Sequence, residues 1–112
     1  MASLGSLLMA GPAYADNQEC GELSNGQLCV EMANLRGKVY SSYRKDSGAA
    51  SMIMLGYQPK GAAKVYDGDW QVISKGQVRG SRASVSISLA KCIRAIMKTP
   101  DENEYISKWR CP

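Results

Sequence analysis

The 112-residue chain contains no histidine and no phenylalanine. Without histidine it cannot build a Ser-His-Asp or Cys-His nucleophile, and it has no histidine ligand for a metal. Without phenylalanine, tryptophan and tyrosine must supply the aromatic volume of the core. There is also no P-loop and no Gly-rich dinucleotide motif, so the sequence predicts no cofactor. Two Asp or Glu side chains across a cleft would still permit hydrolysis, but a small β domain has little room for such a cleft. We therefore predict that the protein is not an enzyme.

Long apolar runs are also missing, and the N-terminal run Leu4–Ala10 is too short to span a bilayer. It is followed by Ala13-Tyr14-Ala15, an A-x-A pattern typical of signal-peptidase cleavage. No Lys or Arg precedes Arg36, so the charged beginning of a signal peptide is absent and the true start is expected upstream. We interpret residues 1–15 as a signal peptide remnant, with a frayed apolar tail as the alternative. Residues 16–112 are then expected to form one secreted domain.

Four cysteines, Cys20, Cys29, Cys92 and Cys111, form an even set, which in a secreted protein favours two disulfides. The spacing does not suit zinc, because there is no CxxC pair. Sequence alone leaves three connectivities open. We favour the local one, Cys20–Cys29 with Cys92–Cys111. An antiparallel hairpin at the C-terminus would place Cys92 opposite Cys111, close enough to be bridged.

That hairpin would be folded from Cys92–Lys98 and Tyr105–Arg110, with the polar segment Thr99–Glu104 as its turn. The facing pairs expected from this register are Arg94 with Trp109, Met97 with Ile106 and Lys98 with Tyr105. A helix over Leu89–Lys98 is the competing interpretation, because its apolar residues could also form a helical stripe.

The remaining chain alternates between apolar and polar residues in short segments. Leu28, Val30 and Met32 would share one face of a strand, and Val39, Ser41 and Tyr43 one face of the next. The apolar run Ala50–Tyr57, flanked by Gly and Pro, indicates a buried strand. Gln77–Arg79 begins a further strand that Gly80 and Ser81 would loosen, and serines alternate with apolar residues over 84–89.

Asp67-Gly68 lies between Lys64–Tyr66 and Trp70–Ser74 and is a two-residue hairpin signal. Asp67 and Asp69 also have the spacing of calcium ligands, but the further oxygen ligands of a calcium loop are absent, so we favour the turn. About eight short strands separated by Gly and Asp/Asn turns predict an all-β fold, a small antiparallel sandwich or barrel.

The charged residues indicate little about chemistry. The net charge is +4, but the fourteen basic residues are scattered, and no basic run exceeds Arg44-Lys45. Nucleic-acid binding needs a concentrated patch, so we predict no nucleic-acid partner, and no stable membrane insertion. The acidic segment Asp101–Glu104 is interpreted as a solvated turn, and no metal site is predicted.

The candidate binding surface consists of two aromatic residues and a cation: Trp109, Tyr105 and Arg94. Trp109 could stack against Arg94 across the C-terminal hairpin. Such a surface suits sugar rings or a protein partner. For Trp70 we favour packing in the core.

Several short patterns together resemble small secreted all-β, four-cysteine proteins of Streptomyces and related actinobacteria, most of which have no assigned activity. The resemblance lies in Cys20, Gly26–Val30, the Tyr-rich segment Val39–Tyr43, Gly68–Val72, Cys92 and Cys111. It implies an extracellular all-β domain and transfers no functional residue. Streptomyces subtilisin inhibitors are similar in size and disulfide number, but this chain departs from their cysteine spacing.

The leading expectation is a non-catalytic secreted interaction domain that binds an extracellular protein or a cell-wall polysaccharide. Two disulfides would make it rigid and so lower the ordering cost of binding. A secreted protease inhibitor, presenting Arg36-Gly37-Lys38 or Gln58–Ala63, is one alternative. A small secreted toxin or antimicrobial protein is another, although no long basic amphipathic helix is present.

Overall fold

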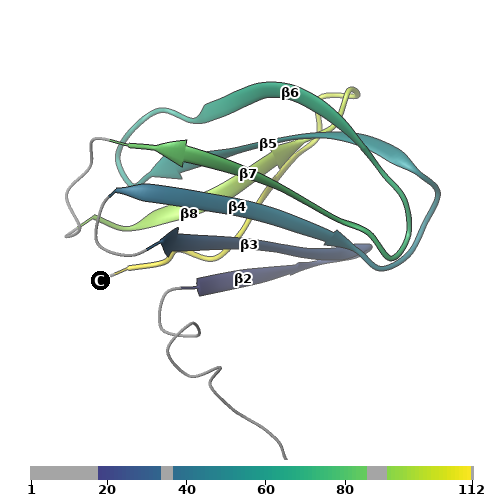
Figure 1. Cartoon of the computed structure of the whole chain (residues 1–112), viewed down its shortest axis with the longest axis horizontal. Coiled ribbons are helices and arrows are strands. Elements are labelled where there is room, and N and C mark those ends of the chain that lie inside the picture. Colours follow the sequence, from purple (N-terminus) through teal and green to yellow (C-terminus); the bar gives the residue numbers. More distant parts are fainter. Residues whose placement is uncertain (1–17, 34–36, 86–90, 112) are drawn as a thin grey trace, which may run out of the picture.

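The computed structural model describes residues 18–33, 37–85 and 91–111. The strands are β2 (Gln18–Leu23), β3 (Gly26–Ala33), β4 (Lys38–Lys45), β5 (Ser51–Pro59), β6 (Val65–Ile73), β7 (Val78–Ser84), β8 (Ile93–Lys98) and β9 (Glu104–Ile106). They form two antiparallel four-stranded sheets, in the orders β2-β3-β4-β7 and β6-β5-β8-β9 (Figure 1). The predicted all-β class is therefore confirmed, and of the two architectures it is the sandwich. The predicted signal peptide remnant, residues 1–15, and most of the serine alternation lie outside the described residues.

None of the described segments is a helix long and apolar enough to cross a bilayer.

The core fills the space between the sheets. It is formed by the side chains that point inward at every second residue of a strand. Leu28, Val30 and Met32 of β3 are buried, as are Val39 and Tyr43 of β4. These faces agree with the sequence prediction. Opposite them lie apolar side chains of the second sheet: Ile53, Leu55, Ile73, Ile93, Ala95 and Met97.

The core also contains a polar side chain that forms a hydrogen bond between the two sheets. Ser41 is buried on the inner face of β4, and its hydroxyl donates a hydrogen bond of 2.7 Å to the carbonyl of Gly56 on β5. A buried hydroxyl needs such a partner, and this bond ties the two sheets together.

The edge strands β6 and β7 belong to different sheets (Figure 1). Side chains of each strand form hydrogen bonds with the backbone of the other. Arg79 Nε of β7 donates a 3.0 Å hydrogen bond to the carbonyl of Val72 on β6. In the other direction, Gln71 Nε2 of β6 donates to the carbonyl of Gly80 on β7 at 3.3 Å. These side chains occupy backbone acceptors that another β-strand would otherwise pair with.

Both disulfides have the predicted local connectivity. Cys20 and Cys29 are directly opposed on β2 and β3, with Cα atoms 4.0 Å apart. Cys92 and Cys111 join the two ends of the C-terminal hairpin, with Cα atoms 4.1 Å apart.

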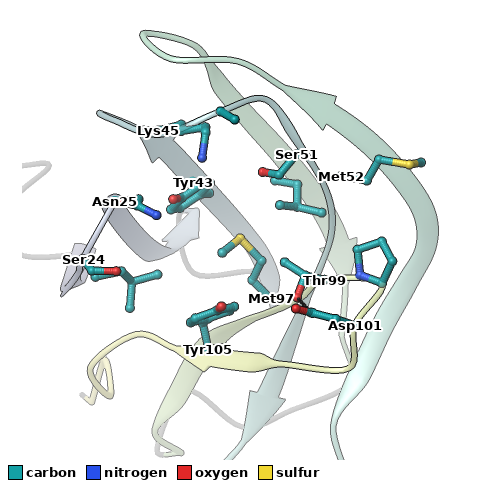
Figure 2. A pocket seen from close by; sticks show the side chains of 14 residues that line it. Ser24, Asn25, Tyr43, Lys45, Ser51, Met52, Met97, Thr99, Asp101 and Tyr105 are labelled. Atoms are coloured by element: carbon teal, nitrogen blue, oxygen red, sulfur yellow. Dashed lines mark hydrogen bonds between the residues drawn. The ribbon is translucent and has the colours of Figure 1, made fainter.

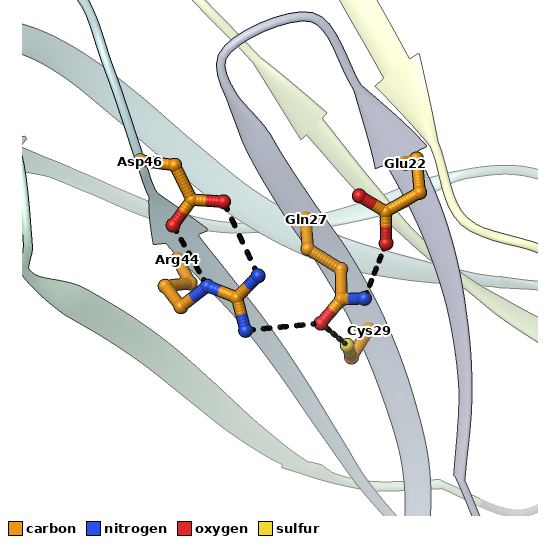
Figure 3. A network of polar contacts seen from close by, with 5 residues as sticks. All are labelled: Glu22, Gln27, Cys29, Arg44 and Asp46. Carbon is orange, nitrogen blue, oxygen red and sulfur yellow. Dashed lines mark hydrogen bonds and ion pairs between the residues drawn. The ribbon is translucent and has the colours of Figure 1, made fainter.

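A polar network lies beside the first disulfide on the outer side of its sheet (Figure 3). Arg44 forms an ion pair with Asp46 through two hydrogen bonds, of 2.8 and 3.2 Å, which lowers the pKa of the Asp46 carboxyl. Arg44 also donates to Gln27 Oε1 at 3.4 Å, and the Gln27 amide donates to Glu22. Gln27 Oε1 lies 3.6 Å from Cys29 Sγ, which has no proton to donate because it is in a disulfide. The network links three neighbouring strands across one sheet surface.

The predicted hairpin at Asp67-Gly68 is wrong. β6 runs unbroken from Val65 to Ile73, and its pairing with β5 shifts between Met54 and Gly56. Gly68 has a φ of +82°, and the Asp67 carboxylate accepts a 2.9 Å hydrogen bond from the backbone of Asp69. A bulge and a tight turn need the same residues, because both require a positive φ at glycine. The real β5–β6 turn contains Gly61, which also has positive φ.

Strand boundaries differ from the prediction in two other places. β2 was not predicted, because Gln18–Leu23 is polar and lies on an edge. β7 continues through Gly80 and Ser81, where a looser strand was expected. The predicted number of about eight strands is confirmed, because the prediction omitted β2 but counted β6 as two strands.

The C-terminal hairpin has the predicted register at its disulfide end, where Ile93 pairs with Arg110. At its tip the register is shifted by one residue, so Met97 faces Tyr105 instead of Ile106. The extra residue is accommodated at Ser107, whose N–H donates to the Ala95 carbonyl at 3.0 Å. The Ser107 hydroxyl oxygen in turn accepts from the Ala95 N–H at 2.9 Å. The alternative prediction of a helix over Leu89–Lys98 is wrong for Ile93–Lys98, which forms strand β8.

Candidate functional site

The solvent side of the β6-β5-β8-β9 sheet, which we call the outer face, carries most of the large exposed apolar side chains. Directly paired strand residues project to the same side of a sheet. Val72 of β6 is paired with Met52 of β5, and Trp70 with Met54. Met52, Trp70, Val72 and Ile106 are between 41% and 56% exposed. The expected core position of Trp70 is therefore wrong, because its strand register turns it outward.

The centre of the outer face is covered by Tyr66. Ile96 also projects outward, since it is paired with Gly56, yet it is completely buried. Tyr66 is paired with the same glycine, and its ring lies 4.5 Å from the Lys98 ammonium on the far strand β8. We infer that the Tyr66 ring crosses over Gly56 and shields Ile96. Because glycine has no side chain, Gly56 leaves space for the Tyr66 ring.

The hydroxyl of Tyr66 stays protonated well beyond neutral pH. Burial raises its pKa, and the neighbouring Glu104 carboxylate adds to the effect, bringing it to about 12. Glu104 forms an ion pair with Lys64, whose hydrogen bond lowers the pKa of the Glu104 carboxyl. The centre of the face therefore combines one carboxylate with a neutral hydroxyl.

A second aromatic group adjoins the disulfide Cys92–Cys111. The guanidinium carbon of Arg94 lies 4.3 Å from the centre of the Trp109 ring, and Lys60 Nζ lies 5.9 Å from it. Arg94 is held in place because its Nε and Nη2 donate to Gln58 Oε1 at 3.0 and 2.8 Å. The stack of Trp109 and Arg94 that the sequence suggested is present in the structure.

Tyr105, the third residue of the predicted surface, lies elsewhere. The one-residue shift in the hairpin pairs it with Met97, which belongs to the core, so Tyr105 projects to the inner side. Sequence reasoning missed Tyr66 and Lys98 as a pair. Their meeting depends on the order β6-β5-β8, which no local pattern encodes.

Comparisons of the chain with protein-family models, curated proteins and solved structures found no match. Within 18–33, 37–85 and 91–111, no three His, Cys, Asp or Glu side chains are placed to hold a metal ion. What the outer face offers is apolar area, aromatic rings and fixed cations. Such a surface can recognise and hold a partner.

Proposed function

We propose that the protein is a non-catalytic, secreted binding domain whose outer face engages an acidic surface of another extracellular protein. The observation that carries the proposal is the gathering of exposed Trp70, Met52 and Val72 on the same sheet face as the Arg94–Trp109 stack. Aromatic residues, Met and Arg are the types enriched at the centres of protein interfaces.

Charge supports an acidic partner. Lys60, Lys64, Arg94 and Lys98 contribute four cations on and beside the outer face, of which Lys64 is paired with Glu104. Complementary charge raises the association rate and excludes wrong partners.

A polysaccharide is less well supported, because sugars bind by stacking on free aromatic faces. Arg94 and Lys60 approach the ring of Trp109, and Lys98 approaches that of Tyr66. A sugar would have to displace these cations. Trp70 alone would then serve as a stacking platform.

Rigidity and compartment also fit the proposal. The Cys92–Cys111 disulfide closes the hairpin beside Trp109, so less conformational entropy is lost when this end of the face binds. Disulfides persist in oxidising surroundings, and the A-x-A pattern at Ala13–Ala15 supports export.

The experiment compares two matched substitutions, Val72→Ser on the outer face and Val78→Ser on the opposite sheet. The two valines are 56% and 53% exposed. The full oxidised chain and both variants are immobilised and incubated with native culture supernatant and with washed cell wall, and bound proteins are quantified by mass spectrometry. We expect an acidic protein that the wild type and Val78→Ser retain and that Val72→Ser loses.

Three outcomes would overturn the proposal. The first is retention by wall polysaccharide instead of protein. The second is equal retention of the same protein by both variants. The third is no specific retention by the wild type at low ionic strength, where attraction between exposed charges is strongest.

A protease inhibitor remains a second candidate because of the loop that follows β5. Residues 60–64 are all exposed, yet the loop is fixed. Lys60 N–H donates to the Cys92 carbonyl at 2.9 Å, and the Ala62 carbonyl accepts from Gln58 Nε2 at 3.0 Å. In the other suggested loop, Arg36 lies outside the described residues. Stoichiometric inhibition of trypsin that Lys60→Ala abolishes would establish this function, and steady cleavage of the loop would exclude it.

A further inference from the structure

A cleft opens between the two sheets at one end of the sandwich (Figure 2), and neither Arg94 nor Trp109 lines it. Its walls come from the β2–β3 turn, the end of β4, the start of β5 and the β8–β9 turn. Its volume is about 440 Å³, within the roughly 300–1,000 Å³ typical of small-molecule sites. Leu23, Ile53 and Met97 provide apolar lining.

The cleft contains a buried lysine. Lys45 is the last residue of β4 and projects inward, on the same side as Tyr43, with only 4% of its surface exposed. Its backbone is fixed by hydrogen bonds to Gln77 and Gly76, of 3.0 and 2.7 Å. In Figure 2 the Lys45 ammonium points into the cleft toward Tyr43.

No hydrogen bond or ion pair joins this ammonium to any residue of the described ranges. The two nearby carboxylates are engaged elsewhere. Asp46 is bound by Arg44 outside the cleft, and Asp101 accepts a hydrogen bond from Thr99. The stem of Lys45 is packed into the fold, whereas its ammonium is not fully buried and reaches the open space of the cleft, where a ligand can pair with it.

A second donor lies beside Lys45. A Cβ atom placed on Gly48 would be 3.5 Å from both Lys45 Nζ and Asn25 Nδ2, so the two groups approach the same point of the loop. The Asn25 side-chain oxygen accepts from the Ser47 hydroxyl at 3.1 Å. That bond occupies the oxygen of the amide and leaves its N–H groups available. Tyr43 adds a protonated hydroxyl, because burial raises its pKa and Asp46 adds to the effect.

We infer that the cleft binds a small amphiphilic carboxylate, whose anionic group pairs with Lys45 and Asn25 and whose apolar body lies against Leu23, Ile53 and Met97. The chemistry follows from the lining. One cation and an amide donor stand at one wall, and apolar side chains line the space beside them. The Asp101 carboxylate at the opposite wall disfavours a second anion on the ligand. This site is separate from the outer face and does not depend on the proposed protein partner.

Octanoate is a suitable probe, with 1-octanol as its uncharged analogue. Binding to the full oxidised chain is measured by calorimetry, and the Asn25 side-chain amide is followed in ¹H–¹⁵N spectra. We expect saturable binding of octanoate with a shift of that amide, and weaker binding of octanol. Lys45→Met should weaken octanoate binding by about tenfold or more, because it removes a charge-assisted contact, and should change octanol binding little. Lys38→Met, at the opposite, exposed end of β4, is the matched control and should bind like the wild type.

Stability gives an independent readout. If Lys45 is held for a ligand, Lys45→Met should melt no lower than the wild type without ligand, because the ammonium bonds to nothing in the described fold and methionine keeps the apolar packing of the buried stem. If Met prevents folding, Lys45→Gln makes the same test of affinity. Four results would each overturn the inference: no octanoate binding at millimolar concentration, equal affinities for octanoate and octanol, unchanged octanoate affinity in the Lys45 variants, or shifts confined to residues outside the cleft.

Discussion

Gly56 is the position where one added methyl group should disturb both the fold and the outer face. It lies in the middle of β5, between β6 and β8. A Cβ atom there would lie 2.2 Å from the carbonyl oxygen of Val65 and 2.8 Å from Cα of Tyr66. Both are backbone atoms of a paired strand and cannot rotate away. Gly56→Ala must therefore push β6 outward and lift Tyr66 from above Ile96.

The size of the effect follows from two opposing terms. Overpacking a well-packed site costs roughly 1–3 kcal/mol, and the upper end applies here because the clash is with backbone. Alanine has less conformational freedom than glycine in the unfolded chain, and this stabilises the folded state of the variant by about 0.5–1 kcal/mol. We expect Gly56→Ala to lower the free energy of unfolding by about 2 kcal/mol or more.

Gly80 of β7 provides the control. A Cβ atom there would lie 2.2 Å from the Tyr40 hydroxyl, and its nearest neighbours all belong to that side chain. The Tyr40 ring can swing away, losing its contact with Arg82, which lies 5.3 Å from the ring centre. The overpacking cost is then about 1 kcal/mol, and the entropy term nearly offsets it.

Urea denaturation of the oxidised wild type and both variants, followed by tryptophan fluorescence, measures these free energies. A loss of less than about 1 kcal/mol in Gly56→Ala, a third of the expected overpacking cost, would show that no backbone clash forms there. An equal loss in Gly80→Ala would show that the rigid backbone beside Gly56 makes no difference.

The other predictions concern the disulfides and Tyr66. In the chain-entropy model, replacing Cys92 and Cys111 with serine should lower stability by about 3 kcal/mol, and replacing Cys20 and Cys29 by about 2.5 kcal/mol, because the bridged separations are 19 and 9 residues. Equal midpoints in urea for the two double variants and the wild type would contradict this. The pKa of Tyr66 is raised from 10.0 to about 12, so the folded state binds its proton more tightly than the unfolded state. The stability this contributes is complete below pH 10 and is lost as pH rises through 12, so between these values the wild type should lose more stability than Tyr66→Phe.

The fold class, the disulfide pairing and the buried faces of β3 and β4 could be predicted because each depends on local pattern. Leu28, Val30 and Met32 alternate strictly, and the simple C-terminal hairpin places Cys92 opposite Cys111. Asp67-Gly68 was misread because a bulge and a turn require the same backbone conformation.

The candidate sites depend on contacts that are distant in sequence. A single inserted residue near Ser107 moved Tyr105 to the inner side of its sheet, and a one-residue slip always reverses the face of a side chain. In the sequence Lys45 stood out only as half of the longest basic run, Arg44-Lys45. Its burial depends on the loop after β4 and on the β6–β7 turn, whose backbone at Gly76 and Gln77 fixes it.

Two arginines, one on each sheet, test whether the outer face is the binding surface. Arg94 stacks on Trp109 on the outer face, and Arg82 stacks on Tyr40 on the opposite sheet. The measurement is the dissociation constant of the captured acidic protein for the wild type, Arg94→Ala and Arg82→Ala, at low and at physiological ionic strength. We predict that Arg94→Ala raises Kd by about thirtyfold, as a loss of about 2 kcal/mol at an interface hot spot requires, and that Arg82→Ala changes it by less than about twofold. Equal constants for the two variants would show that the partner binds somewhere else.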